Sequence, residues 1–307
     1  MESTGKEYKG YLFVHFTSDD GEDGEQIYFS ISRDGFHYTD LNDGKPILRS
    51  AIGEMGARDP FIIRSPWENK YYLIATDLRI ASGKGWHVAQ YEGSRDLLVW
   101  ESEDLVNWEG PVAHTVGVPG AGCVWAPEAI YDEEKDSIMV FWASMTAIGD
   151  ETPKQRIYRA YTKDFKTFTE SEIYIERDNH VIDTTIIKAS EGYYRYSKDE
   201  TTKYIRVDFG KDLEPGSFTH VESKTLDGIY GVEGPEIFKL NGEEKWCLIV
   251  DRFAAHEGYL PLVTEDLASG EFRVLEDAEF DFGKTLKRHG GILNLTEEEY
   301  NRLAKLI

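Results

Sequence analysis

Cysteine and long hydrophobic segments are scarce in this sequence of 307 residues. Its two cysteines, Cys123 and Cys247, lie in separate apolar segments, which predicts reduced, buried side chains and not a disulfide framework. No apolar segment reaches the roughly 18 residues that a membrane-spanning helix needs. These absences exclude a small disulfide-rich protein and a helical membrane protein.

Basic residues are also few. Lys and Arg total 34 against 57 Asp and Glu, so the formal net charge is -23. A charge of this sign repels phosphate backbones and anionic lipid surfaces, so we expect no nucleic-acid partner and no membrane partner. No segment typical of a signal peptide precedes Tyr11. The expected location is therefore the cytoplasm, or outside the cell if a signal peptide has been removed.

Helical periodicity is weak along almost the whole chain. The exception is the segment 296–300, where Thr296 followed three residues later by Glu299 predicts a capped helix near the C-terminus. Elsewhere, β-branched and aromatic residues alternate with Gly, Asp and Asn, a composition typical of strands and turns. No Pro-, Gly- or Ser-rich linker divides the chain, so residues 1–307 are expected to form a single all-β domain.

One pattern of strands occurs five times. An apolar segment that opens on polar residues comes first, and an aromatic-rich segment follows it. The apolar segments are residues 58–63, 125–130, 182–187, 233–238 and 288–293, and the aromatic-rich segments are residues 11–16, 71–76, 138–143, 193–197 and 246–251. Repeats spaced by roughly 50 to 70 residues indicate a radial or solenoid architecture, because one unit cannot bury its own apolar face.

The two ends of the chain carry complementary unpaired copies of this pattern. Residues 11–16 have no apolar segment before them, and residues 288–293 have no aromatic-rich segment after them. Pairing the two would make the last strand the inner strand of a blade built from residues 11–40, and would remove exposed sheet edges. A β-sandwich with coincidental repeats would not require this match. We therefore predict a five-bladed β-propeller, closed by the C-terminal strand joining the N-terminal blade.

Acidic residues recur near the starts of the predicted inner strands, where they would converge on one mouth of the ring. They are Asp59, Glu128, Asp183 and Glu233, with His289 at the fifth position. Carboxylates gathered in one cavity repel each other and raise each other's pKa values. Because this arrangement costs stability, it is expected mainly where the groups perform chemistry. Hydrolysis of a glycosidic bond with inversion needs one carboxylate to activate water and one carboxylic acid, about 6.5–9.5 Å away, to protonate the leaving oxygen.

These motifs resemble those of glycoside hydrolase family 43, five-bladed propeller enzymes that remove arabinofuranosyl or xylosyl units with inversion. The resemblance extends along the chain through Arg58-Asp59-Pro60-Phe61, Val232-Glu233-Gly234-Pro235 and Arg288-His289-Gly290. It implies that Asp59 is the general base and Glu233 the general acid. It also implies that Asp183 orients the acid and keeps it protonated, although Thr184 follows it where many relatives have proline.

The resemblance implies further roles around the axis. Arg288 matches an arginine that holds the sugar, and His289 matches a histidine often associated with a metal ion or water. Calcium is the structural ion expected there, and no cofactor is required for the chemistry. For Glu128 three roles stay open. It could replace Asp183 as the carboxylate that modulates the acid, it could hydrogen-bond a sugar hydroxyl, or it could be purely structural.

Some tryptophans are candidates for sugar contacts. Trp125 lies at the start of a predicted inner strand and is expected to stack on a sugar face. Trp86 and His87 follow the glycines of segment 83–87, which is either a loop that overhangs the mouth or an ordinary surface loop.

The predicted function is release of terminal α-L-arabinofuranosyl units from arabinose-containing oligosaccharides or polysaccharide side chains. A β-D-xylosidase or a dual activity stays open, because arabinofuranose and xylopyranose present similar hydroxyl positions to one pocket. A sucrose- or fructan-cleaving propeller would retain configuration and needs Asn-Asp-Pro and Glu-Cys motifs, which this sequence lacks. The alternative of another class is a glycan-binding propeller without catalysis. The oligomeric state is not predicted.

Overall fold

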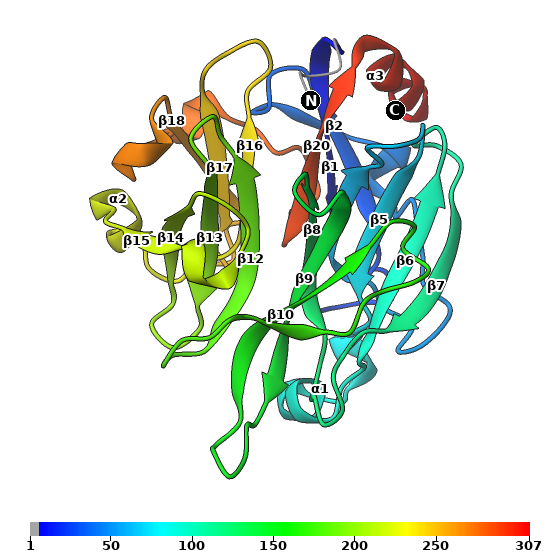
Figure 1. The fold of residues 1–307 in the computed structure, drawn as a ribbon. Helices are drawn as coiled ribbons and strands as arrows, with labels where there is room; N and C mark the ends of the chain where they lie inside the picture. Colours follow the sequence, from blue (N-terminus) through cyan, green and yellow to red (C-terminus); the bar gives the residue numbers. More distant parts are fainter. Residues whose placement is uncertain (1–5) are drawn as a thin grey trace.

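The computed structural model describes residues 6–307, which form five antiparallel sheets of four strands each. The sheets stand around a common axis as the blades of a ring (Figure 1). This arrangement confirms the predicted five-bladed β-propeller. Within residues 6–307, no helix is long and apolar enough to cross a membrane.

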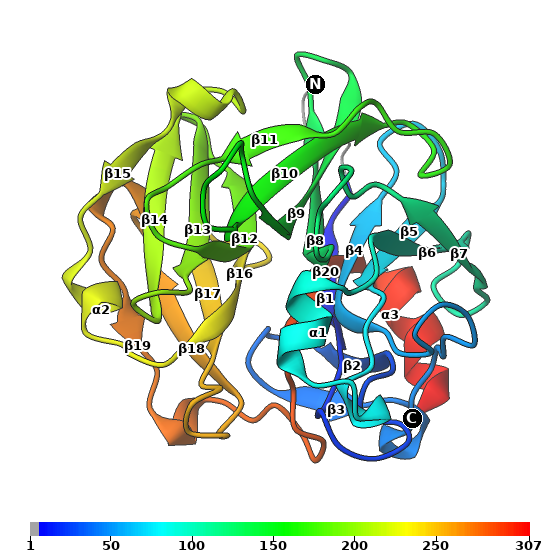
Figure 2. The ribbon, with the colours of Figure 1, turned by 90° about the horizontal axis from the view of Figure 1, so that it is seen from below.

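The blades are numbered along the chain, and their strands are given from the axis outwards. The first blade contains β20 (Gly290–Thr296), β1 (Tyr8–His15), β2 (Tyr28–Ser32) and β3 (Tyr38–Asp40), and the second contains β4 (Arg58–Arg64), β5 (Tyr71–Thr76), β6 (Asp96–Ser102) and β7 (Glu109–Thr115). The third contains β8 (Trp125–Asp132), β9 (Ser137–Thr146), β10 (Lys154–Thr162) and β11 (Glu172–Ile175). The fourth contains β12 (Val181–Lys188), β13 (Tyr193–Asp199), β14 (Tyr204–Gly210) and β15 (Thr219–Val221), and the fifth contains β16 (Glu233–Lys239), β17 (Trp246–Asp251), β18 (Tyr259–Thr264) and β19 (Arg273–Val274). In Figure 2, the strands β4, β8, β12, β16 and β20 lie nearest the centre of the ring.

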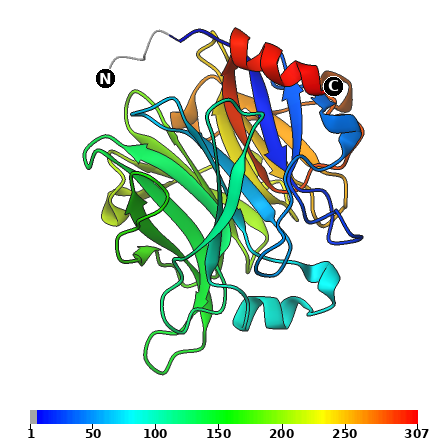
Figure 3. The ribbon, with the colours of Figure 1, turned by 90° about the vertical axis from the view of Figure 1, so that its right-hand side faces the viewer.

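Short helices connect or cover these strands. In the described part of the chain, the α-helices are α1 (Trp86–Tyr91), α2 (Lys224–Asp227) and α3 (Glu297–Leu303). The 3-10 helices are η1 (Asn42–Gly44), η2 (Ile80–Ser82), η3 (Pro215–Ser217), η4 (Leu267–Ser269), η5 (Asp277–Glu279) and η6 (Ala304–Leu306). Figure 3 shows α1 and α3 on opposite sides of the ring.

The C-terminal strand closes the ring as predicted. β20 pairs with β1 from His15 opposite Gly290 to Tyr8 opposite Thr296, so the last strand is the inner strand of the N-terminal blade. The predicted capped helix is α3, with a reciprocal Thr296–Glu299 capping box. Glu299 also accepts hydrogen bonds from Arg64 at 2.9 Å and from the Tyr71 hydroxyl, both in the second blade. The helix therefore fastens the closed blade to its neighbour.

The hydrophobic core lies between neighbouring blades. In β5, Tyr71, Leu73 and Ala75 belong to the cluster shared with the first blade, whereas Tyr72 and Ile74 belong to the cluster shared with the third. This alternation follows from the two-residue period of a strand and buries both faces of the sheet. Elsewhere in the core, the two cysteines are buried and unpaired, as the sequence predicts.

Candidate active site

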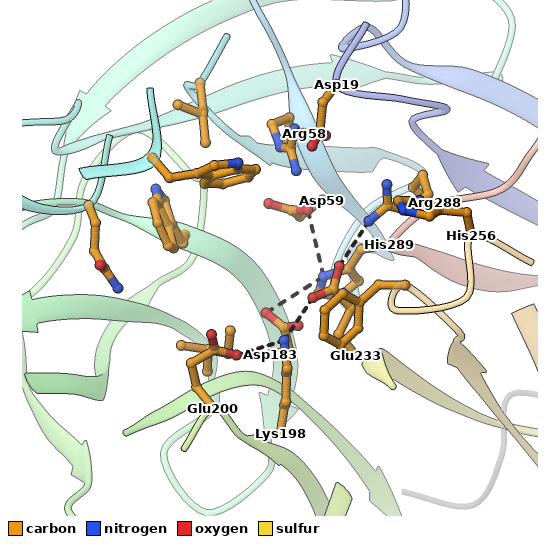
Figure 4. A pocket seen from close by; sticks show the side chains of 16 residues that line it. Asp19, Arg58, Asp59, Asp183, Lys198, Glu200, Glu233, His256, Arg288 and His289 are labelled. Carbon is orange, nitrogen blue, oxygen red and sulfur yellow. Dashed lines mark hydrogen bonds and ion pairs between the residues drawn. The ribbon is translucent and has the colours of Figure 1, made fainter. Parts of the chain in front are cut away.

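A cavity of about 370 Å³ opens at the mouth of the ring, where the inner strands begin. Its volume lies at the lower end of the range typical of small-ligand sites. Of the residues expected in the site, those that line the cavity are Asp59, Trp125, Asp183, Glu233, Arg288 and His289. They come from the second to fifth blades and from the closing segment, so the closed ring brings them together (Figure 4).

Four inner strands begin with the same backbone irregularity. Each has a register shift against its neighbouring strand and, at its second or third residue, a positive φ: Asp59 at 48°, Ala126 at 47°, Asp183 at 45° and Gly234 at 50°. A bulge of this kind turns a side chain out of the regular alternation, and Asp tolerates the left-handed region better than most residues. The bulges thus aim Asp59 and Asp183 into the mouth.

Asp59 is positioned by a hydroxyl group of the neighbouring strand. Thr76 Oγ1 donates to Asp59 Oδ2 at 3.0 Å and accepts a hydrogen bond from the Ala126 amide at 2.8 Å. The other carboxylate oxygen of Asp59 lies 3.7 Å from His289 Nδ1. This environment holds the side chain in place and leaves it at the cavity wall, as a carboxylate that activates water requires.

Glu233 lies between two basic side chains. Its Oε2 is 2.8 Å from Lys198 Nζ, and its Oε1 is 3.0 Å from Arg288 Nη2. Burial raises the pKa of Glu233, but the charge and hydrogen bond of Lys198, followed by the charge of Arg288, outweigh burial and lower the pKa below its ordinary value. In this arrangement Glu233 is therefore held as a carboxylate.

Asp183 accepts a hydrogen bond from the backbone beside Glu233. Its Oδ2 accepts a hydrogen bond from the Gly234 amide at 3.0 Å, and its Oδ1 lies 3.8 Å from His289 Nδ1. Burial raises the pKa of Asp183 to about 6, against the lowering effect of the charges on His289 and Lys198. A proton thus resides on Asp183 at mildly acidic pH, next to the carboxylate of Glu233.

The sequence analysis missed several charged residues in or beside the cavity, of which Lys198 and Asp251 contact the predicted site residues directly. Lys198, which is 2% exposed, lies in β13 and also pairs with Glu200 at 2.7 Å. Asp251 lies in β17 and accepts a hydrogen bond from Arg288 Nε at 2.7 Å. Burial raises the pKa of Asp251 to about 6, although the charge of Arg288 lowers it.

The end of a second strand contains a signal for Asp251, although not for Lys198. Antiparallel pairing places the end of a second strand opposite the start of the inner strand, as with Asp251 opposite Glu233 and Thr76 opposite Arg58. Thr76 and Asp251 are the last residues of their predicted aromatic-rich segments. Polar residues at that position therefore mark the site.

Glu128 lies outside the cavity, which differs from the sequence expectation. It is 3% exposed and lies three residues beyond Trp125 in β8, at the position that Glu236 occupies in β16. The bulged strand starts correspond to Trp125 and Glu233, so Glu128 is deeper along the axis than the mouth carboxylates. Glu128 is therefore not among the residues that can contact a sugar in this cavity.

The surroundings of His289 bear on the expected metal ion. Its Nδ1 faces the carboxylates of Asp59 and Asp183. Among residues 6–307, no group of three or more His, Cys, Asp or Glu side chains has an arrangement that could hold a metal ion. A calcium ion beside His289 would thus take most of its ligands from water, and its presence stays a prediction.

Comparison with known proteins places this chain in a family of probable glycosyl hydrolases. Residues 6–301 match a family described as "Probable glycosyl hydrolase domain", which is related to glycoside hydrolase family 43. The chain belongs to this family. Its resemblance to family 43 is thereby confirmed.

A curated relative provides a more specific comparison. An "Alpha-L-arabinofuranosidase" of Bifidobacterium longum subsp. longum is 32% identical over 290 residues, which cover 80% of this chain and 27% of the relative. The chain therefore spans about a quarter of the length of the curated relative that it matches.

Solved structures share the fold of this chain. A family 43 β-1,3-galactosidase has a TM-score of 0.62 at 15% identity, covering 90% of this chain and 58% of the other. An α-L-arabinanase of Penicillium chrysogenum, complexed with arabinobiose, has a TM-score of 0.55 at 11% identity, covering 92% and 84%. At these identities the similarity shows the propeller fold alone.

Proposed function

We propose that the protein is an inverting, exo-acting glycoside hydrolase that releases terminal α-L-arabinofuranosyl units from oligosaccharides. The observation that carries this proposal is that Asp59 and Glu233 face one small cavity in different surroundings, a hydroxyl group beside Asp59 and two cations beside Glu233. Two carboxyl groups that face one cavity can divide the roles of base and acid, and Asp183, whose pKa is about 6, is the neighbouring group from which Glu233 obtains its proton. The name of the Bifidobacterium relative supports the choice of sugar.

In the proposed reaction, Asp59 removes a proton from a water molecule, whose oxygen attacks the anomeric carbon. Glu233 donates a proton to the leaving oxygen as the glycosidic C–O bond breaks on the opposite side of the ring. Bond formation and bond cleavage on opposite sides invert the anomeric configuration. Asp59 finishes protonated and Glu233 ionised, and exchange of protons with solvent restores both.

Glu233 needs a proton for this role, and its surroundings without substrate favour the ionised form. We propose that Asp183 and Glu233 together retain one proton at mildly acidic pH, because the pKa of Asp183 is about 6. The proton passes to Glu233 when the leaving oxygen of the sugar approaches and Lys198 releases its hydrogen bond to Oε2. Loss of that proton then sets the alkaline limit of activity.

The remaining cavity residues hold the sugar in this proposal. Arg288 is fixed by Asp251 and Glu233, so its guanidinium group is positioned to contact a sugar hydroxyl. Trp125 offers an aromatic face to the ring. His289 lies between Asp59 and Asp183 and reduces their mutual repulsion when it is protonated.

The test is a panel of p-nitrophenyl glycosides, with α-L-arabinofuranoside, β-D-xyloside and β-D-galactoside assayed side by side. We expect the arabinofuranoside to have the highest kcat/KM. Proton NMR of the first product should show the β-anomer of arabinose before mutarotation. A faster reaction with the xyloside would reassign the sugar, and first appearance of the α-anomer would overturn the inverting mechanism. Binding of arabinosides without hydrolysis would show a glycan-binding propeller.

A further inference from the structure

A long connection overhangs the cavity on one side. Residues 77–95, between β5 and β6, form the longest connection between the second and third strands of any blade, and they contain η2 and α1. We call residues 77–95 the α1 arm. It follows the end of β5, which lies opposite the start of β4 at the cavity mouth. Trp86 and Gln90 of this arm line the cavity together with Trp125.

Two carboxylates hold the α1 arm at its two ends. Glu25, between β1 and β2, is buried, and Glu54, between β3 and β4, is half-buried. Glu25 accepts hydrogen bonds from the amides of Ile80 at 2.7 Å and Ala81 at 2.9 Å. Glu54 accepts a hydrogen bond from the amide of Ser94 at 3.1 Å and pairs with Lys84. These contacts fix the arm to the first blade and to the connection between the first and second blades, and so preorganise it.

The helix of the arm packs closely against the segment that leads into β8, the inner strand of the third blade. Ala89 in α1 is fully buried, and the Gly93 amide donates to the Gly122 carbonyl at 2.8 Å. A Cβ atom at Gly122 would lie 2.4 Å from the Gln90 carbonyl oxygen, so only glycine allows this approach. The position of Trp86 is therefore set by the packing of the helix that carries it.

Trp86 nevertheless stays largely exposed. It is 48% exposed at the first residue of α1, and the Arg58 guanidinium lies 5.1 Å from its ring. Trp125 meets it edge-to-face, with ring centroids 6.0 Å apart. Within residues 6–307 the Trp86 indole nitrogen has no hydrogen-bond partner, whereas that of the exposed Trp67 donates to Asp136 at 3.0 Å. A fixed, exposed indole at the edge of a cavity is a surface suited to an amphipathic ligand.

We infer that Trp86, with Gln90 beside it, binds a second sugar ring of a neutral oligosaccharide, next to the ring held at Asp59 and Glu233. The indole face covers the apolar face of the ring, while the indole N–H and the Gln90 amide are free to contact hydroxyl groups. The acidic residues of the cavity disfavour an anionic sugar at this position. The inference rests on the proposed function, and it predicts a preference for oligosaccharides over simple glycosides.

The experiment compares kcat/KM for methyl α-L-arabinofuranoside and for an α-1,5-linked arabinotriose. Trp86→Ala should lower kcat/KM for the trisaccharide about tenfold, chiefly by raising KM, and should change the value for the methyl glycoside less than twofold. Trp86→Phe should recover most of the loss because it keeps an aromatic face. Trp67→Ala, which removes an exposed tryptophan outside this cavity, should change neither value.

An equal loss on both substrates, or no loss on either, would overturn the second sugar position. Failure of the proposed function has a different signature, because the wild-type protein would then hydrolyse neither arabinoside. In that case, isothermal titration calorimetry with arabino-, xylo- and galacto-oligosaccharides tests the subsite alone. Weaker binding of one oligosaccharide series by Trp86→Ala than by the wild-type protein would support the second sugar position. Unchanged binding of all three series, or no binding of any of them, would refute it.

Discussion

Acidic side chains occupy two levels along the propeller axis, and the two levels differ in the charges around them. At the mouth, Glu233 contacts Lys198 and Arg288, and its pKa lies below its ordinary value. Deeper along the axis, Glu128 and Glu236 are buried and form no ion pair within the described residues; burial raises the pKa of Glu236 to about 8.

The comparison shows what separates a reactive carboxyl group from an inert one on this scaffold. Burial alone keeps Glu236 protonated, with its oxygens satisfied by the Ile292 amide at 2.7 Å and the Thr185 hydroxyl at 3.2 Å. Glu233, at the mouth, contacts the basic side chains of Lys198 and Arg288. Its protonation therefore depends on contacts that a substrate can change. Substitutions at both levels would break or sharpen this contrast.

The largest effect is expected from removing the proposed base or acid. Asp59→Ala and Glu233→Gln should each lower kcat/KM for an arabino-oligosaccharide by roughly 100- to 10,000-fold, because general acid–base catalysis contributes rate factors of this size. A 2,4-dinitrophenyl arabinofuranoside, whose leaving group needs no proton, should restore much of the activity of Glu233→Gln but not of Asp59→Ala. Near wild-type turnover of the oligosaccharide by either variant would refute that role.

The next effect concerns the proton shared at the mouth. In the wild-type protein the alkaline limb of the kcat/KM profile is expected near pH 6, the pKa of Asp183. Asp183→Asn should move this limb to lower pH and reduce activity at pH 7 by about tenfold or more, because the one remaining proton then leaves from Glu233. The measurement is the pH dependence of kcat/KM. An unchanged limb would exclude Asp183 as the group that retains the proton.

A smaller shift in the opposite direction is expected for Lys198. Burial raises the pKa of Asp183 while Lys198 lowers it, and Lys198 also lowers that of Glu233. Lys198→Met should therefore move the alkaline limb upward by about one pH unit. Arg206→Met, on the exposed side of the fourth blade, is a control that should leave the profile in place. A downward movement in Lys198→Met would contradict the proposed electrostatics.

The smallest effect on activity is expected at the deeper level. Glu236→Gln should keep kcat/KM within about twofold of wild type, since Glu236 lies outside the cavity. Its effect should appear in stability. The pKa of Glu236 is about 8 in the folded protein and 4.5 ordinarily, so between these values only the unfolded chain ionises. The free energy of unfolding therefore falls as pH rises through this window, by at most a few kcal/mol.

Urea unfolding at pH 5 and pH 8 measures this effect. In Glu236→Gln the difference between the two pH values should be smaller than in the wild-type protein, and Glu128→Gln should act in the same direction. If the difference stays the same in both variants, the deeper carboxyl groups are not the protonated, buried groups described above.

Much of the site was predictable because the repeat pattern aligns the blades. The recurrent strand segments placed Asp59, Asp183, Glu233 and His289 at the mouth, and the structure brings them to one cavity. Glu128 was misplaced because Trp125-Ala126-Pro127-Glu128 carries its acid two residues later than the bulged position. Counting residues along a strand requires knowing where the bulge lies, and that depends on the pairing with the neighbouring strand.

Other features depended on contacts between distant segments. Lys198 reaches Glu233 across the boundary between the fourth and fifth blades, and the α1 arm takes its position from Glu25 and Glu54. Local sequence patterns contain no signal for such pairs, since their members are separated by tens of residues along the chain. The preferences that make strands and turns act over a few neighbours only.

By itself, the amino-acid sequence determined the repeated strands, the closure of the ring and three of the carboxyl groups at its mouth, Asp59, Asp183 and Glu233. These follow from the alternation of apolar and polar residues and from the matching unpaired segments at the two ends. Only the tertiary structure decided which carboxyl groups meet cations and which stay protonated. The reason is physical, because a pKa depends on burial and on charges within a few ångströms, whichever part of the chain supplies them.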